Sequence, residues 1–228
     1  MEFYAPEKET EDVVLFSKFG MIGEFFLGRM VGGVFEGSRS PGFEHPDTLF
    51  RIKDMPLRLC TAVRVDSTKT YRYVRYFGPR GGFGNVSEVG FYSSWADTEP
   101  LKGDILGPQE GAHGSHSYFN VFDGHTDTSY DHPFDYGGWA GLDLGEKKAI
   151  GKIVYTPRNR DNFVRKDDLY ELLVCHGGEW KSAGTQVAQS DSLLFRNIPK
   201  HALLLLRDLS RGEAERLFEY KDGVQKYW

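Results

Sequence analysis

The sequence has few cysteines, no excess of basic residues and no long apolar run. Its two cysteines, Cys60 and Cys175, supply neither a disulfide framework nor a metal cage, so we expect two isolated, buried thiols. With 28 basic and 33 acidic residues, the chain carries a net charge of −5. A nucleic-acid-binding protein typically carries an excess of positive charge, so this class is not favoured. No apolar stretch comes near the length of about 18 residues that a membrane-spanning helix needs, so we expect no transmembrane segment.

The sequence also lacks targeting and catalytic signatures. Its first residues, MEFYAPEKETEDVV, are acidic and contain neither the basic nor the apolar region of a signal peptide. We therefore expect either a cytoplasmic protein or a piece of an exported one. No G-x-S-x-G, P-loop or H-E-x-x-H pattern occurs. This favours a binding protein, with an enzyme as the least favoured alternative.

The residues that are abundant indicate an all-β chain. Aromatic residues make up 14% of the sequence and there are 27 glycines, a combination typical of strands joined by tight turns. The segment TYRYVRYF (70–77) alternates tyrosines with arginines, as in a strand with one buried face. YELLVC (170–175) and ALLLLRDL (202–209) are short apolar runs that suit inner strands of a sandwich.

Comparison of the chain with itself indicates an internal repeat. Three blocks occur in the same order in both halves, with offsets that loop insertions would explain. The repeat predicts two tandem β-sandwich modules of the jelly-roll type, residues 1–98 and 99–228, of which the first is incomplete or divergent. The paired blocks are 16–26 with 144–154, 47–56 with 191–199, and 71–92 with 203–220.

A family resemblance covers residues 104–220 well and 15–92 more weakly. The ordered segments NVFDG (120–124), WAGLDLG (139–145), KIVYTPRN (152–159) and YELLVCHGGEWKSAG (170–184), followed by AERLFEY, resemble the discoidin-like (coagulation-factor C-type) domains. These share the galactose-binding-like jelly roll and are similar here to carbohydrate-binding modules of exported Bacteroidetes surface enzymes. Within WAGLDLG we expect Leu142 and Leu144 in the core, Trp139 as an anchor and Gly145 as the end of the strand.

The resemblance implies a non-catalytic, carbohydrate-binding accessory region of a larger exported enzyme or surface protein. It would lie outside the cytoplasm, in the periplasm, on the outer surface or secreted. Its partners would be a glycan or glycoprotein and a catalytic domain upstream in the same chain. The alternative is a structural spacer without sugar affinity that positions the catalytic domain.

The resemblance also places the sugar site in loops at one end of the later module. Arginine and amide side chains there would hold hydroxyls while aromatic rings stack on the sugar. Three alternatives stay open. The first is an ion pair between Arg158 and Asp161 or another loop carboxylate, the second is packing of Trp180 at a hairpin end, and the third is an aromatic loop that only plugs the sandwich. The predicted sugar-binding residues are Arg158, Asn162, Tyr130, His132, Tyr136 and Trp180, with Asn159 as a further candidate.

A structural calcium site is the second feature that the resemblance implies. Asp123, Asp127 and Thr128 lie around a glycine turn, and Glu215 is the matching acidic residue from the last strand. Calcium takes six or more oxygen ligands from carboxylates and carbonyls, which such a turn can supply in part. The alternative is an Asx-turn without an ion.

Overall fold

The computed structural model describes residues 9–19, 24–111, 114–212 and 215–228. Strands make up 45% of the chain and helices 5%, so the prediction of an all-β protein is confirmed. The chain forms two compact units. We call Gly23–Arg160 the inserted unit, and Met1–Ile22 together with Asp161–Trp228 the flanking unit.

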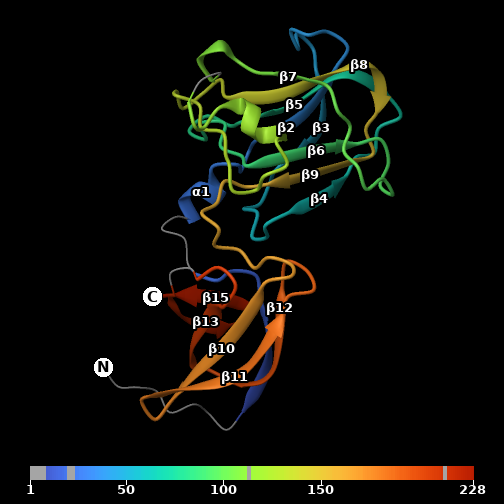
Figure 1. Cartoon of the computed structure of the whole chain (residues 1–228). Coiled ribbons are helices and arrows are strands. Elements are labelled where there is room, and N and C mark those ends of the chain that lie inside the picture. Colours follow the sequence, from blue (N-terminus) through green and yellow to red (C-terminus); the bar gives the residue numbers. More distant parts are fainter. Residues whose placement is uncertain (1–8, 20–23, 112–113, 213–214) are drawn as a thin grey trace. The chain divides into compact units, whose positions relative to one another are not determined.

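The inserted unit is a β-sandwich. One antiparallel sheet has the order β3-β2-β5-β8-β7 and the other the order β4-β9-β6 (Figure 1). Phe35 of β2 packs against rings from the second sheet, with centroid distances of 6.2 Å to Phe91 and 5.3 Å to Tyr155. The elements are α1 (Glu24–Gly28), β2 (Val34–Ser38), β3 (Asp47–Arg51), β4 (Thr61–Arg64), β5 (Thr70–Phe77), β6 (Glu88–Tyr92), β7 (Asp104–Leu106), η1 (Gln109–Gly111), η2 (Tyr118–Phe122), β8 (Trp139–Ala149) and β9 (Lys152–Thr156).

Strand β5 shows why alternating residues form this sheet. Tyr71 and Tyr76 are buried in the core, whereas Arg72 and Arg75 point outward and form ion pairs with carboxylates on neighbouring strands. The Arg72 guanidinium binds Asp143 of β8 at 2.7 Å. The burial of this strand matches the predicted alternation only in part, because the neighbours Tyr73 and Val74 are both buried and the pairing with β8 is irregular between Tyr71 and Tyr73.

Strand β8 confirms one expectation and corrects another. Leu142 and Leu144 are buried, as predicted, and Trp139 packs its ring 5.9 Å from that of Phe43. Gly145 does not end the strand, which continues to Ala149. Instead, its φ of +75° falls where the register with β5 shifts, so this glycine makes a β-bulge inside the strand.

The flanking unit has its own hydrophobic core, formed by residues from both ends of the chain. Its five-stranded sheet has the order β11-β10-β13-β14-β15, and a two-stranded sheet pairs β1 with β12. The strands are β1 (Thr10–Leu15), β10 (Leu169–His176), β11 (Glu179–Val187), β12 (Leu193–Pro199), β13 (Leu203–Asp208), β14 (Leu217–Lys221) and β15 (Val224–Tyr227).

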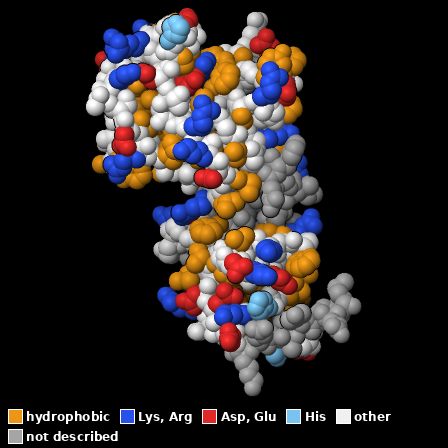
Figure 2. All heavy atoms as spheres, turned by 180° about the vertical axis from the view of Figure 1, so that it is seen from behind, with side chains coloured by type: hydrophobic (Ala, Val, Ile, Leu, Met, Phe, Trp, Pro, Cys, Tyr) orange, Lys and Arg blue, Asp and Glu red, His pale blue; other side chains and the backbone are white. Residues whose placement is uncertain are grey.

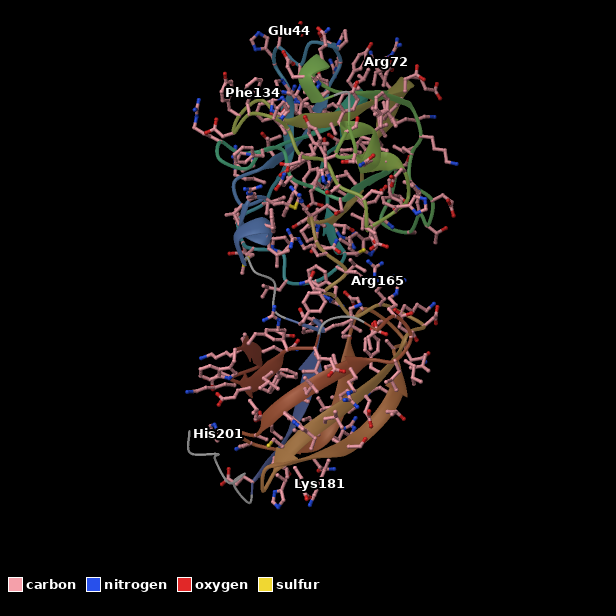
Figure 3. All side chains as sticks on the ribbon, turned by 60° about the vertical axis from the view of Figure 1, so that its left-hand side comes forward. Glu44, Arg72, Phe134, Arg165, Lys181 and His201 are labelled. Atoms are coloured by element: carbon pink, nitrogen blue, oxygen red, sulfur yellow. The ribbon has the colours of Figure 1, made fainter. Side chains whose placement is uncertain are left out.

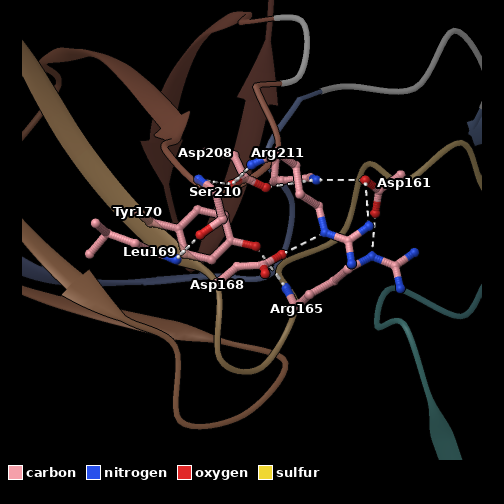
Figure 4. A network of polar contacts seen from close by, with 9 residues as sticks. Asp161, Arg165, Asp168, Leu169, Tyr170, Asp208, Ser210 and Arg211 are labelled. Atoms are coloured by element: carbon pink, nitrogen blue, oxygen red, sulfur yellow. Dashed lines mark hydrogen bonds and ion pairs between the residues drawn. The ribbon is translucent and has the colours of Figure 1, made fainter.

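The chain leaves and re-enters the flanking unit through adjacent segments. Ser17 forms an antiparallel bridge with Phe163, and the Lys18 backbone N–H donates to the Asn162 carbonyl at 2.7 Å. The Lys18 ammonium is buried and binds Asp208 at 3.0 Å. Asp208 belongs to a network of acidic residues, arginines and backbone N–H groups that Figure 4 shows from close by.

This topology corrects the predicted domain boundary between residues 98 and 99. Strand β5 pairs with β8, and β9 lies between β4 and β6, so strands from both halves form one sandwich. Likewise β1 pairs with β12 from the far end of the chain. The two units are nested in sequence rather than tandem, because the segments that complete each sheet are far apart along the chain.

The repeated blocks do not occupy equivalent positions. Residues 71–92 contain β5 and β6, which lie in different sheets, whereas 203–220 contain β13 and β14, which pair directly. The first block, 16–26, includes the start of α1 and lies partly outside the described residues, while its counterpart spans β8 and β9. The blocks that contain β5, β6, β13 and β14 were correctly expected to form strands, and similar strand patterning accounts for their likeness. The described part of 16–26 instead contains an isolated bridge at Ser17 and the start of α1.

The structure bears on the predicted cysteines and on the predicted lack of a transmembrane segment. Both cysteines are free thiols, as predicted, but Cys60 is exposed and Cys175 is half-buried, so the prediction of burial was wrong. Among the described residues, none of the helices combines the length and apolar character that crossing a bilayer requires.

Candidate functional site

Loops that are distant in sequence meet at one end of the inserted unit. Phe77 at the end of β5 is paired with Trp139 at the start of β8, so the loop after β5 and the segment before β8 must be neighbours. The Gly81 N–H donates to the Asp135 carbonyl at 2.6 Å, which ties these two segments together. We call this region, with the adjoining residues after α1, the loop end of the inserted unit.

A hollow of about 330 Å³ lies at the loop end. This volume is at the lower limit of small-molecule sites, and it suits one or two sugar rings. Backbone atoms approach closely on one side, because a Cβ atom on Gly82 would lie 2.5 Å from the Arg29 carbonyl oxygen. The lining residues are Gly28, Arg29, Val31, Pro79, Arg80, Gly81 and Gly82.

A series of aromatic side chains leads from the core to the surface at the same end. Tyr130 is completely buried and His132 is 5% exposed, whereas Phe134 is 51% and Tyr136 is 56% exposed. The Phe134 and Tyr136 rings are stacked, with centroids 6.2 Å apart, and the Arg80 guanidinium lies 5.3 Å from the Tyr136 centroid. Phe134, labelled in Figure 3, lies at the margin of the inserted unit in that view.

The aromatic loop therefore divides the three predicted residues into two groups. Tyr130 and His132 plug the end of the sandwich, and their burial excludes direct contact with a ligand in this conformation. Tyr136 offers an exposed ring beside the hollow. Exposure rises along the loop from Tyr130 to Tyr136, so the division follows how far each residue lies from the core.

A chain of polar contacts lies behind the hollow. The Arg29 guanidinium donates to Asn85 at 2.8 Å, Asn85 donates to Asp131 at 2.6 Å, and Arg158 binds the other oxygen of Asp131. The Arg158 side chain is 17% exposed. The open alternative of an ion pair for Arg158 is therefore confirmed, and Asp131 is its partner.

Positive charge accumulates around one aromatic ring at this end. The guanidinium groups of Arg29, Arg158 and Arg160 lie 5.0, 4.8 and 5.7 Å from the Phe26 centroid. Burial is the main cause that lowers the pKa of Arg29, and the charge of Arg158 lowers it further while Asp131 opposes both. Such an environment is stabilised by additional negative charge.

Two predicted sugar-binding residues belong to the flanking unit instead. Asn162 is 3% exposed, and its backbone carbonyl accepts the hydrogen bond from Lys18. Trp180 is 41% exposed and lies near the tip of the β10–β11 hairpin, opposite Cys175. The further candidate Asn159 is buried, and its amide holds the Thr126 carbonyl at 3.0 Å.

The predicted calcium loop forms an Asx-turn with an unexpected acidic neighbour. One Asp123 oxygen accepts the His125 N–H at 2.7 Å, and the other accepts the Thr128 hydroxyl at 2.8 Å. Glu88 of β6 accepts the Gly124 N–H at 3.1 Å. Burial raises the pKa of Glu88 to about 8; the bond from Gly124 opposes this shift, and the charge of Asp123 adds to it.

One of the other predicted calcium ligands, Glu215, is not part of this cluster. Glu215 lies in the flanking unit and binds Arg207 at 2.9 Å, whereas Glu88 is the acidic strand residue beside Asp123. Asp127 is exposed. Among the described residues, no group of three or more His, Cys, Asp or Glu side chains is arranged to hold a metal ion.

A second hollow of about 390 Å³ lies elsewhere in the inserted unit, near the ends of β2 and β5. It is lined by both acidic and basic residues, and Lys69 there is paired with Asp47 at 2.6 Å. The face in Figure 2 likewise shows acidic and basic side chains interspersed. The hollow at the loop end differs because the charged residues that line it are both arginines.

Sequence reasoning missed several residues of the loop end. Arg80 lies in the segment GPRGGFG (78–84), and Phe134 lies between the predicted residues His132 and Tyr136, but neither was among the predicted residues. Arg29 and Asn85 each follow a glycine directly, yet only the fold brings them into the polar contacts that end at Asp131.

Comparisons with known proteins leave the family unassigned. No family model matches the chain, and no curated protein or solved structure gives a significant match.

Proposed function

We propose that the chain is a non-catalytic carbohydrate-binding region that contacts a glycan at the loop end of the inserted unit. The single observation that supports this most is the exposed Phe134–Tyr136 ring pair beside a hollow that carries Arg80. Exposed rings provide flat apolar surface for the C–H faces of a sugar, and a guanidinium provides directional donors for its oxygens.

The resemblance noted in the sequence extends this proposal to the protein's context. The region would be an accessory part of a larger exported enzyme or surface protein, located outside the cytoplasm, with a glycan or glycoprotein as partner. A catalytic domain upstream in the same chain would supply the chemistry. Of the segments that support the resemblance, NVFDG, WAGLDLG and KIVYTPRN lie in the inserted unit, whereas YELLVCHGGEWKSAG and AERLFEY lie in the flanking unit.

Calcium is proposed as a structural ion at Asp123. The carboxylates of Glu88 and Asp123 face each other there, and the Thr128 hydroxyl is next to them. In the described part of the chain, no basic side chain forms an ion pair with either carboxylate. This donor set fits a hard cation that takes oxygen ligands. Since three acidic side chains do not converge, backbone carbonyls of the turn would have to complete the coordination.

The second candidate function is a structural spacer without sugar affinity. It is favoured by the burial of Tyr130, His132 and Asn162 and by the ion pair that occupies Arg158. In this case the polar groups of the loop end would bind one another and leave none to hold a ligand.

Glycan binding by the intact chain and two variants tests the proposal. Tyr136→Ala should weaken binding at least about tenfold, because a central aromatic contact commonly contributes more than 1 kcal/mol. Trp95→Ala is the matched control, since Trp95 is also an exposed aromatic of the inserted unit, 44% exposed, with the Arg64 guanidinium over its ring. Absence of binding to every glycan on an array, or equal losses in both variants, would refute the proposal and favour the spacer.

A further inference from the structure

The charged side chains that line the hollow at the loop end are all positive among the described residues. Arg29 and Arg80 are the charged residues among its described lining, and no carboxylate lines it. Arg80 is exposed, and within the described part of the chain no carboxylate forms an ion pair with it. Asp135 contributes its backbone carbonyl to Gly81, but its side chain is not among the lining residues.

Asp131 is the acidic residue in the polar contacts behind the hollow, and both of its carboxylate oxygens already accept hydrogen bonds. Asp131 accepts hydrogen bonds from both Arg158 and Asn85, so its single charge is shared among the basic groups behind the hollow. The guanidinium groups of Arg29, Arg158 and Arg160 lie around Phe26, which brings three positive charges to this end of the unit. Burial is the main cause that lowers the pKa of Arg29; Asp131 opposes this shift and Arg158 adds to it.

From this geometry we infer that the hollow at the loop end recognises a carboxylate of an acidic sugar, such as a uronic acid. The inference rests on the proposed carbohydrate-binding function and specifies its substrate class. Arg80 binds the carboxylate, because a planar guanidinium matches a carboxylate with two parallel hydrogen bonds. Arg29 adds positive potential from the wall of the hollow, and the sugar ring lies on the exposed surface of the Phe134–Tyr136 pair.

The Arg64–Trp95 pair elsewhere in the same unit provides a matched comparison. There too a guanidinium lies over an exposed ring, at 4.6 Å from its centroid. Neither residue lines the hollow at the loop end. A ligand that needs only an arginine beside an aromatic ring would use both pairs, whereas a carboxylate held in the hollow would use Arg80 alone.

Calorimetric titration of the intact chain with trigalacturonate and with its carboxyl-reduced counterpart tests this inference. We expect binding of the acidic trisaccharide only, weakening with added salt because the contact is partly exposed. Arg80→Gln should raise the Kd about tenfold, the usual effect of losing a hydrogen bond to a charged group. Arg64→Gln should leave the Kd unchanged.

The outcomes separate this inference from the function on which it rests. Binding of the reduced, neutral trisaccharide as tightly as the acidic one overturns the choice of acidic sugars and leaves carbohydrate binding intact. An unchanged Kd in Arg80→Gln, or equal losses in both arginine variants, overturns the assignment of the carboxylate to the hollow. No binding of any glycan, acidic or neutral, overturns the proposed function and this inference together.

Discussion

Replacement of Lys18 by methionine should destabilise the flanking unit strongly. The Lys18 side chain is 2% exposed, and its ammonium binds Asp208 at 3.0 Å and Asp161 at 3.2 Å. The two carboxylates differ in what remains after the replacement. Asp161 keeps its ion pairs with Arg165 and Arg211. Asp208, with a side chain 1% exposed, keeps the backbone N–H groups of Ser210 and Arg211, and no second basic side chain among the described residues pairs with it.

The expected loss of unfolding free energy follows from the charge that remains on Asp208. Removal of one partner from a buried ion pair costs about 3–5 kcal/mol, since the other charge stays buried without compensation. The N–H groups of Ser210 and Arg211 still donate to one Asp208 oxygen at 2.9 Å, so we expect the lower end, about 3 kcal/mol. Methionine fills nearly the same volume as the lysine stem, so a cavity adds little.

Denaturant unfolding measures the loss of stability, and hydrogen exchange shows which of the two units has lost it. Peptides from β10 and β13 should lose protection in Lys18→Met, while peptides from β5 and β8 should not, because the two units have separate cores. Lys200→Met is the matched control, since Lys200 and its partner Glu9 are 38% and 71% exposed, and it should cost at most about 1 kcal/mol.

A second variant tests the reasoning about Asp208 directly. In Lys18→Met/Asp208→Asn the buried charge is removed along with its partner, so part of the stability should return. The reasoning would be refuted if Lys18→Met cost no more than Lys200→Met, or if the added Asp208→Asn change made the loss greater.

Two further predictions concern the carboxylates beside the Asp123 turn. Because folding raises the pKa of Glu88 from 4.5 to about 8, the folded protein holds a proton that the unfolded chain releases, so wild-type stability should fall as pH rises from 4.5 to 8 relative to Glu88→Gln. Thermal unfolding across this range checks it, and parallel curves for the two proteins would contradict it. Calcium chloride should raise the unfolding midpoint of the inserted unit in the wild type and not in Asp123→Asn, since an ion that binds only the folded state stabilises it by mass action. An equal shift in both proteins, or none in either, would exclude a calcium site at this turn.

The sequence by itself determined the strands and the roles that depend on local alternation. The buried leucines of β8 lie two residues apart and share one face of the sheet, because side chains alternate along a strand, which is a property of neighbouring residues. The Asx-turn at Asp123 likewise depends on residues within one short segment.

Only the tertiary structure decided the nesting of the two units and the composition of the loop end. Strand partners such as β5 with β8 are chosen by which buried faces complete a common core, and local pattern does not encode that choice. For the same reason the sequence could not select Asp131 for Arg158, Glu88 for Asp123 or Arg80 for Tyr136. Each of these pairs joins segments that become neighbours only when the sheets close around the core.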